Sequence, residues 1–294
     1  MTDGIVDVVV LNWNGQDVII PCLESLGKVA DPPLRVMVVD NASTDGSADL
    51  VREKYPGIEL VENPRNLLFA EGNNVGLRKI MERGGRYLLL LNNDTEVDPD
   101  FIREMMKGMD DDEAGIVGPK IFYFDKPSTI WYGGGGFIPL LWIPKHENIR
   151  KNETPDDDVI RSTEWVSGCA MLVRREVFEE IGLLDPLYTI YCEDVDLCLR
   201  AREVGWKCLY APHARVWHKV SSSSGGGMTP FKLENRIAST VRLFRRFQPG
   251  CWSILMAPVH LLTFIIMLAG LLVTGRPGLA RAALKGARRG LSER

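Results

Sequence analysis

The densest group of carboxylates in the chain is Glu193-Asp194-Val195-Asp196, which follows the aromatic segment Tyr188-Thr189-Ile190-Tyr191. Three carboxylates within four residues repel one another unless a ligand or a neighbouring group uses them. A helix that begins here would stabilise one or two of them through its dipole, so helix capping is the alternative explanation for those two. For the third, a role as a general base or a metal ligand is favoured.

Three apolar runs, residues 8–11, 36–39 and 88–91, each end in Asn or Asp. Continuous apolar runs are typical of strands that are buried on both faces of a parallel sheet. In such sheets, ligands bind beyond the C-terminal ends of the strands. Turn formation and helix capping would explain one such polar residue, but three in succession favour a polar pocket at this edge.

The loop Asp40-Asn41-Ala42-Ser43-Thr44-Asp45-Gly46-Ser47 puts acid, hydroxyl and amide groups around a tight turn, a set that can hold a ribose or a base edge. The chain has no Gly-x-Gly-x-x-Gly and no Gly-Lys-Ser/Thr, so neither a dinucleotide motif nor a P-loop is predicted. Asp94 follows the most apolar run and could coordinate a hard cation that bridges two phosphates. Because Asp98 before Pro99 is a suitable helix N-cap, Asp94 is not needed for capping.

His218 stands out among the four histidines, because it follows the strand-like residues 214–217 and precedes the Ser/Gly-rich segment 221–227. A single histidine is usually a surface or core residue. Its place beside a segment of linker composition suits a metal ligand, or a pocket that a lid closes.

The alternation of apolar runs with amphipathic stretches implies βαβ units, and hence an α/β fold with a mainly parallel sheet flanked by helices. Expected helices are 18–26, 48–54, 74–82, 101–109, 175–181 and 195–204, with further strands at 58–61, 169–173 and 214–217. The segment 122–161 contains Gly133 to Gly136, prolines and Asp156-Asp157-Asp158, and this composition predicts an irregular segment.

The composition, with 294 residues, 45% hydrophobic, 25% charged and a net charge of −4, is that of a folded protein. Mild acidity argues against a nucleic-acid binder. Six scattered cysteines without a CxxC pair suggest reduced, buried thiols, and a zinc or disulfide framework is not expected. Residues 1–7 lack an apolar signal-peptide region, so the folded part is expected in the cytoplasm.

Residues 252–273 are nearly continuous in apolar side chains, close to the roughly 20 residues that cross a bilayer. Pro258 and His260 interrupt the run, and basic residues lie on both sides, so the positive-inside rule gives no orientation. A helix pair lying in the cytoplasmic leaflet is therefore favoured, with a true span as the alternative. The basic residues are Arg242, Arg245, Arg246, Arg276, Arg281, Lys285, Arg288 and Arg289.

In these motifs the chain resembles family 2 glycosyltransferases of the GT-A fold, in particular the bacterial rhamnosyltransferase-like branch. The resemblance covers roughly the first 225 residues, and the motifs occur in order, which is more specific than any one of them. They are Val10-Leu11-Asn12-Trp13-Asn14-Gly15, Val39 to Gly46, Asn66 to Gly76, Leu91-Asn92-Asn93-Asp94, Gly168, Glu193 to Arg200, and Trp217-His218.

The resemblance implies that Asp194 is the general base, that Glu193, Asp196 and Gly168 shape the acceptor side, and that Asp94 and His218 bind Mg²⁺ or Mn²⁺. Asn92 stands at the first acidic position of the DxD-like motif, so a weaker or second-sphere contact with the metal is expected there. The residues assigned to the nucleotide-sugar donor are Asn12, Asn14, Asp40, Ser43, Asp45, Asn66, Asn74, Asn92 and Asn93.

The implied reaction is a single in-line displacement with inversion at the anomeric carbon. Leu68 departs from the related loop, which commonly carries Gly within Asn-x-Gly-Phe-Ala, and this predicts a different backbone path around Asn66 and Asn74. With no Gln-x-x-Arg-Trp motif, the chain is expected to add one or a few sugars rather than to polymerise.

Residues 1–225 are expected to form the catalytic domain, and residues 226–294 a basic, hydrophobic helical region that associates with the cytoplasmic face of the cell membrane. The expected partners are a nucleotide-diphosphate sugar, with deoxythymidine-diphosphate rhamnose as the first candidate, and a polyprenyl-linked saccharide acceptor. A homo-oligomer is compatible with the sequence. The alternatives are a membrane-tethered nucleotide-sugar scaffold without transfer activity and a sugar-phosphate nucleotidylyltransferase.

Overall fold

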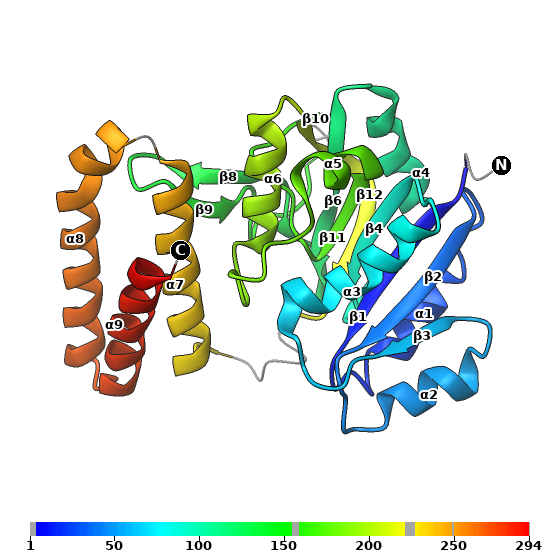
Figure 1. Ribbon diagram of the computed structural model, residues 1–294, viewed down its shortest axis with the longest axis horizontal. Helices are drawn as coiled ribbons and strands as arrows, with labels where there is room; N and C mark the ends of the chain where they lie inside the picture. The colour runs from blue at the N-terminus through cyan, green and yellow to red at the C-terminus, as the bar shows by residue number, and fades with distance from the viewer. Residues whose placement is uncertain (1–3, 155–158, 221–226, 249, 294) are drawn as a thin grey trace.

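The computed structural model describes residues 4–154, 159–220, 227–248 and 250–293. Figure 1 shows one large sheet with helices on both faces, and a group of three helices at the C-terminal end of the chain, beside the sheet domain. The acidic run 156–158 and most of the segment 221–227 lie outside the described residues.

Four parallel strands form the N-terminal half of the sheet. They are β1 (Val6–Asn12), β2 (Leu34–Asp40), β3 (Glu59–Glu62) and β4 (Tyr87–Asn92), and β1 lies between β2 and β4. The side chains of β1 and β4 are almost wholly buried, which explains why these strands are continuous apolar runs. The predicted parallel α/β core is confirmed, and its C-terminal strand ends meet at one edge.

The other half of the sheet mixes strand directions. β11 (Ala170–Arg174) pairs antiparallel with both β4 and β6 (Ala114–Tyr123), and β12 (Lys207–His218) runs parallel to β6. The full order is β10-β12-β6-β11-β4-β1-β2-β3, with β5 (Thr95–Val97) paired to the end of β12. This order brings the ends of β4 and β12 to the same part of the sheet.

The prediction of an irregular segment at 122–161 was wrong. The structure has the edge strand β7 (Lys126–Tyr132), the hairpin β8 (Gly135–Ile138) and β9 (Ile143–His146), and the short β10 (Arg161–Ser162). β7 begins with exposed Lys, Pro and Ser residues, as an edge strand can. It therefore lacks the apolar run by which buried strands are recognised.

The helices before residue 220 follow the expected series, with shifted ends. They are α1 (Ile19–Leu26), α2 (Ser47–Lys54), α3 (Leu68–Glu82), α4 (Phe101–Met106, continued by the 3-10 turn Lys107–Asp110), α5 (Arg175–Ile181) and α6 (Glu193–Glu203). Asp98 is not the N-cap of α4. Asp100 occupies that position, and the Asp98 carboxylate accepts a hydrogen bond from the Asp100 N–H at 2.9 Å.

The C-terminal unit consists of α7 (Pro230–Phe247), α8 (Gly250–Val273) and α9 (Pro277–Ser292), which lie side by side (Figure 1). Gly286 and Gly290 allow α9 to approach α7 closely, since a Cβ on Gly286 would lie 2.4 Å from the Glu234 carbonyl oxygen. α8 continues through Pro258. Among the described residues, one helix is long and apolar enough to cross a membrane, Ile254–Val273, with a mean hydropathy of 2.3 and 6% of the segment buried.

Candidate functional site

Hydrogen bonds between buried side chains join the ends of β1, β2 and β4. Asn12 Nδ2 donates to Asp40 Oδ1 at 2.8 Å, and Asn12 Oδ1 accepts from Asn93 Nδ2 at 2.7 Å. Gly15 lies against this pair, and a Cβ there would come within 2.2 Å of Asn93 Nδ2. The structure therefore brings three of the predicted donor-site residues together in one fixed arrangement.

The loop after β2 is preorganised by its own side chains. Ser43 donates to Asp40 through both its hydroxyl, at 2.6 Å, and its N–H, at 2.9 Å. Asp45 accepts from the Ser47 hydroxyl at 2.6 Å, and Asn14 accepts from the Thr44 N–H at 2.8 Å. Asp40 is buried and occupied within the loop, whereas Asn14 is exposed and Ser43 and Asp45 are half-buried. Asn14, from the loop after β1, and Ser43 and Asp45, from the loop after β2, are therefore the accessible members of this hydrogen-bonded group.

Asn41 holds the segment that leads into α3. It is 1% exposed, it donates to Asn66 Oδ1 at 3.1 Å, and its own Oδ1 accepts from the Leu67 N–H at 3.1 Å. Leu68 has a φ of 63°. Glycine adopts this left-handed conformation without strain, so the backbone at Leu68 is one that a glycine would favour.

Asn74 does not lie among the strand-end side chains. Its amide makes two hydrogen bonds with the backbone of Leu184, Nδ2 to the carbonyl at 2.8 Å and Oδ1 from the N–H at 3.1 Å. Asn74 is buried within α3. It therefore fixes the loop that precedes the acidic cluster, although sequence reasoning assigned it to the donor.

Asn74→Ala should lower the free energy of unfolding by about 2–3 kcal/mol, because it leaves both backbone groups of Leu184 buried without partners. The neighbouring Asn73→Ala is the matched control, since the side-chain hydrogen bond of Asn73 within the described residues goes to the Phe69 carbonyl of its own helix, at 2.9 Å. It should cost about 1 kcal/mol or less. Denaturant titration of both variants measures the difference, and equal losses would contradict the assigned role of Asn74.

The acidic cluster lies in the first turn of α6, because this helix begins two residues before its predicted start. Asp194 Oδ2 accepts from the Gly168 N–H at 2.9 Å, and its Oδ1 accepts from the Val195 N–H at 2.8 Å. A residue larger than glycine at position 168 would crowd its neighbours, because a Cβ there would lie 3.3 Å from Asp194 Cβ. Tyr191 and Cys192, just before the cluster, both have positive φ, and such strain is concentrated at functional sites.

Glu193 and Asp194 differ in their surroundings although they are adjacent. Glu193 is 6% exposed, and in the part of the chain that the structure describes its Oε2 has no hydrogen-bond partner. Burial and the charge of Asp194 raise the pKa of Glu193 well above its usual range. Burial also raises the pKa of Asp194, but the Gly168 and Val195 N–H groups oppose that shift. Asp194 is therefore the more readily ionised of the two carboxyl groups.

Asp196 points away from Asp194 and is completely buried. Its two oxygens accept from Arg200 Nε at 2.7 Å and from a terminal nitrogen of Arg246 at 2.9 Å. Arg246 belongs to α7. The same helix bonds the preceding loop through Asn235 to Thr189, 2.7 Å, and through Ser239 to the Ile190 carbonyl, 3.2 Å. α7 thus holds the segment that carries the acidic cluster.

The antiparallel pairing of β5 with the end of β12 places His218 opposite Thr95, and hence beside Asp94. His218 Nε2 lies 3.1 Å from Asp94 Oδ1, and both side chains are buried. Burial lowers the pKa of His218, but Cys169 and the Asp94 carboxylate outweigh it and raise the pKa well above its usual value. Asn92, at the end of β4, is half-buried.

This carboxylate and imidazole pair fits a divalent cation in its chemistry. His218 Nδ1 is buried and, among the described residues, has no hydrogen-bond partner. Within the same residues no group of three or more His, Cys, Asp or Glu side chains could hold a metal alone. Asp94 and His218 would therefore supply two ligands, and groups of other kinds, such as diphosphate oxygens and water, would supply the remaining ones. Trp131 packs edge-on against His218, with ring centroids 4.7 Å apart.

Comparison with known proteins agrees with this geometry. Residues 7–182 match the family model "Glycosyl transferase family 2". The chain is 28% identical over 221 residues to the N-acetylglucosaminyl-diphospho-decaprenol L-rhamnosyltransferase of Mycobacterium tuberculosis (strain CDC 1551 / Oshkosh), covering 69% of this chain and 72% of that protein.

Two solved glycosyltransferases share the fold. The structure of GalNAc-T7 with UDP, GalNAc and Mn²⁺ matches with a TM-score of 0.66 and 19% identity, over 84% of this chain and about half (48%) of that one. The mannosyltransferase PcManGT of Pyrobaculum calidifontis, in complex with GDP-Man and Mn²⁺, matches with a TM-score of 0.61 and 18% identity, over 98% and 87% of the two chains. The fold is thus GT-A. Because the family model matches residues 7–182, which is more than half of the chain, the chain belongs to glycosyl transferase family 2.

Proposed function

We propose that this glycosyltransferase moves a sugar from a nucleotide-diphosphate donor to a hydroxyl group of a lipid-linked saccharide, with a divalent cation and with inversion. The observation that carries the proposal is the asymmetry of the acidic turn. Asp194 receives the Gly168 and Val195 N–H groups and is half-buried, whereas the adjacent Glu193 is buried and its Oε2 has no hydrogen-bond partner among the described residues. One carboxylate is therefore available as a base, and it lies at the edge of the protein surface.

Each group has a defined task in this scheme. The nucleoside contacts Asn14, Ser43 and Asp45. The hydrogen bonds that join Asn12, Asp40 and Asn93 hold the ends of β1, β2 and β4 in place. Asp94 and His218 hold Mg²⁺ or Mn²⁺, which when bound stabilises the negative charge of the diphosphate leaving group. Asn66 and Asn92 stay assigned to the donor side, Asn92 in the second sphere.

Asp194 accepts the proton of the acceptor hydroxyl as its oxygen attacks the anomeric carbon from the face opposite the leaving group. The bond between the anomeric carbon and the diphosphate oxygen breaks, and its electron pair leaves with the nucleoside diphosphate. Gly168 and Val195 hold the carboxylate of Asp194 in one orientation. Asp196 acts on the acceptor side by fixing the turn around this base through Arg200 and Arg246, and Glu193 stays assigned to the acceptor side.

Support for a lipid-linked acceptor comes from the C-terminal unit and from a relative. The Mycobacterium tuberculosis relative is named for a diphospho-decaprenol acceptor. In this chain α8 exposes large apolar side chains along its length, among them Leu262 and Ile266. We therefore assign residues 226–294 to attachment at the cytoplasmic face of the membrane, and residues 1–225 to catalysis. α7 serves both parts, because it also bonds the loop before Asp194.

A panel of nucleotide sugars tests the activity. The purified full chain is incubated with Mn²⁺ and a polyprenyl-diphospho-saccharide, and the release of nucleoside diphosphate is measured for each donor. We expect one donor, deoxythymidine-diphosphate rhamnose first, to give acceptor-dependent release. Binding of a donor without release from any member of the panel would instead favour the scaffold alternative.

The double variant Leu262→Glu/Ile266→Glu should lose association with vesicles, because each charge at the centre of an apolar membrane helix costs about 2–3 kcal/mol. Both side chains are more than half exposed, 58% and 60%, so folding stability should change by less than about 0.5 kcal/mol. Val159→Glu, at a position 75% exposed and outside the C-terminal unit, is the control. Co-sedimentation with vesicles measures the effect, and unchanged sedimentation of the double variant would refute attachment through α8.

A further inference from the structure

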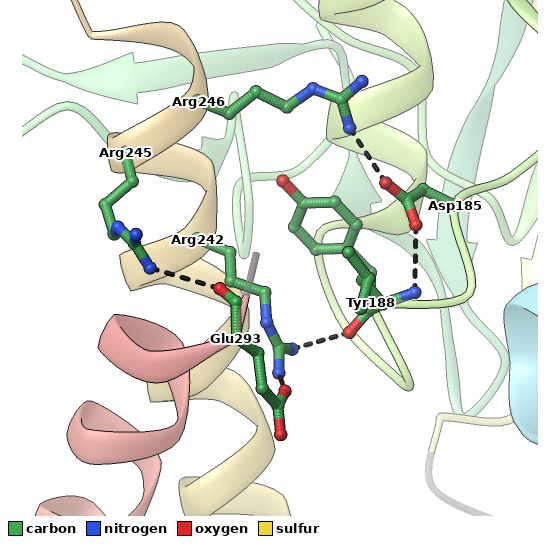
Figure 2. A pocket seen from close by; sticks show the side chains of 7 residues that line it. Asp185, Tyr188, Arg242, Arg245, Arg246 and Glu293 are labelled. Carbon is green, nitrogen blue, oxygen red and sulfur yellow. Dashed lines mark hydrogen bonds and ion pairs between the residues drawn. The ribbon is translucent and has the colours of Figure 1, made fainter.

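A cavity of about 360 Å³ lies between α7, the end of α9 and the loop before the acidic turn (Figure 2). Arg242, Arg245 and Arg246 line it, spaced three and four residues apart on one face of α7. Asp185 and Tyr188, from the loop, form the facing wall. The scheme of catalysis above leaves this cavity unused.

The three arginines are not equally matched by negative charge. Arg246 is paired with both Asp185 and Asp196, at 2.9 Å each. Arg245 donates to carbonyl groups at the C-terminal end of α9, such as that of Leu291 at 2.7 Å. These contacts provide hydrogen-bond acceptors for the guanidinium groups of Arg245 and Arg246.

Arg242 is the exception. It is only 6% exposed, it donates to the Leu187 carbonyl at 2.6 Å, and it forms an ion pair with the Glu293 carboxylate. Its Nε is buried and, within those residues, has no hydrogen-bond acceptor. Burial and the nearby charge of Arg289 lower the pKa of Arg242. A buried, incompletely solvated guanidinium favours an anionic ligand.

Glu293 occupies the position that such a ligand would take. It follows the last residue of α9, and its side chain is 44% exposed, so it can leave without disrupting the core. Figure 2 shows its carboxylate against the Arg242 guanidinium. Guanidinium groups bind carboxylate and phosphate in the same planar, two-pronged way, and a phosphate would bring more charge and more acceptor oxygens.

We propose that this cavity binds a phosphate or diphosphate group of a membrane lipid, and that Glu293 holds the site closed until the group enters. The assignment of the lipid-linked acceptor as its source rests on the function proposed above. The loop of Asp185 and Tyr188 leads directly to Asp194, and α8, which packs against α9, offers an apolar face for a lipid chain. A diphosphate here would lie between the sugar and the lipid.

Direct titration with inorganic diphosphate tests the site. The full chain is titrated calorimetrically with EDTA present, so that metal-dependent binding at the donor site does not contribute. We expect Glu293→Gln to bind diphosphate about tenfold more tightly than the unaltered chain, and Arg242→Gln about tenfold more weakly. Arg281→Gln removes the same charge from an exposed position of α9 outside the cavity, and should match the unaltered chain.

Equal affinities in all four proteins, or no binding by Glu293→Gln, would overturn the proposal. Glu293→Gln is decisive even where Arg242→Gln fails to fold. This titration needs no turnover, so a failure of the proposed transfer reaction, seen as donors that are never consumed, is a separate result.

Two further assays separate the sources of the phosphate. If the acceptor supplies it, Arg242→Gln raises the KM for the lipid-linked acceptor in phosphatidylcholine vesicles about tenfold, and the KM for the donor much less. If bulk anionic lipid supplies it, Glu293→Gln strengthens binding to phosphatidylglycerol vesicles and the acceptor KM stays unchanged. Either pattern supports the phosphate site, and the absence of both contradicts it.

Discussion

Asp194→Asn should lower kcat/KM by about 10³-fold or more, whereas Glu193→Gln should stay within about threefold of the unaltered enzyme. The two substitutions make the same change, carboxylate to amide, at neighbouring positions. They differ because Asp194 is held ionised by the Gly168 and Val195 N–H groups. Burial and the charge of Asp194 raise the pKa of Glu193 well above its usual range, so its carboxyl group favours the neutral form. The measurement is acceptor-dependent release of nucleoside diphosphate.

The pH dependence follows from the same difference. The pKa of Asp194 lies above that of an ordinary aspartate because of burial, so kcat/KM should fall as the pH drops through this raised value. Glu193→Gln should leave that acidic limb in place. For stability, a raised carboxyl pKa in the folded state means that Glu193 destabilises the fold as the pH rises from the unfolded value through the folded one. Glu193→Gln should therefore unfold at a higher temperature at neutral pH, with a smaller gain in acid.

Loss of activity in Glu193→Gln with retention in Asp194→Asn would reverse the assignment of the base. Circular dichroism of both variants provides the folding control. An equal loss in both would mean that the turn works as a unit, and this too contradicts a single base at Asp194.

Removal of the metal should abolish transfer, and Asp94→Ala and His218→Ala should each lower kcat by about 10²-fold or more at a fixed Mn²⁺ concentration. The reason is that the two side chains lie 3.1 Å apart and are the two metal ligands that the proposed scheme takes from the protein. Because each variant keeps one ligand, raising the Mn²⁺ concentration should restore part of the activity. A titration of activity with Mn²⁺ after treatment with EDTA measures both effects.

Glu96→Ala is the matched control for the metal prediction. Glu96 is an acid two residues from Asp94, but its side chain forms an ion pair with Lys219 at 2.8 Å and is 34% exposed. It should change the Mn²⁺ dependence by less than about twofold, as surface ion pairs contribute little. Full activity of the unaltered chain in EDTA would refute the metal-dependent scheme.

The parts of the fold that sequence reasoning predicted well are those with a strong local signal. β1, β2 and β4 are apolar runs of buried strands, and α5 was expected at its observed ends, Arg175–Ile181. The strand-end positions of Asn12, Asp40 and Asn93 followed from the same runs, since parallel strands bring their ends together. The sequence pattern was thus sufficient for the polar character of this edge of the sheet.

Contacts between distant segments could not be predicted in the same way. Asn74 lies 110 residues from Leu184, whose backbone it bonds. Asp196 sits beside the base in sequence, yet its partner Arg246 comes from α7, 50 residues later. Asn41 carried a signal that was not used, because a polar residue next to the end of a buried strand is itself expected to be buried and bonded.

The ends of α3 and α6 show a second limit. α3 begins at Leu68, six residues before the expected start, and α6 begins at Glu193 rather than at Val195. α3 starts at Leu68 and α6 starts directly after Cys192, and both residues have a positive φ. This is a strained conformation that no composition rule anticipates. Tertiary contacts hold these turns, so the local sequence alone does not place them.

The anomeric configuration of the product tests the central claim most directly. The full chain is incubated with its donor, Mn²⁺ and the lipid-linked acceptor, and the one-bond carbon–proton coupling at the new anomeric centre is measured by NMR. A single displacement with Asp194 as the base predicts one new glycosidic bond whose configuration is opposite to that of the donor. A product with the donor's configuration, or free sugar with no glycosidic product, would contradict this account.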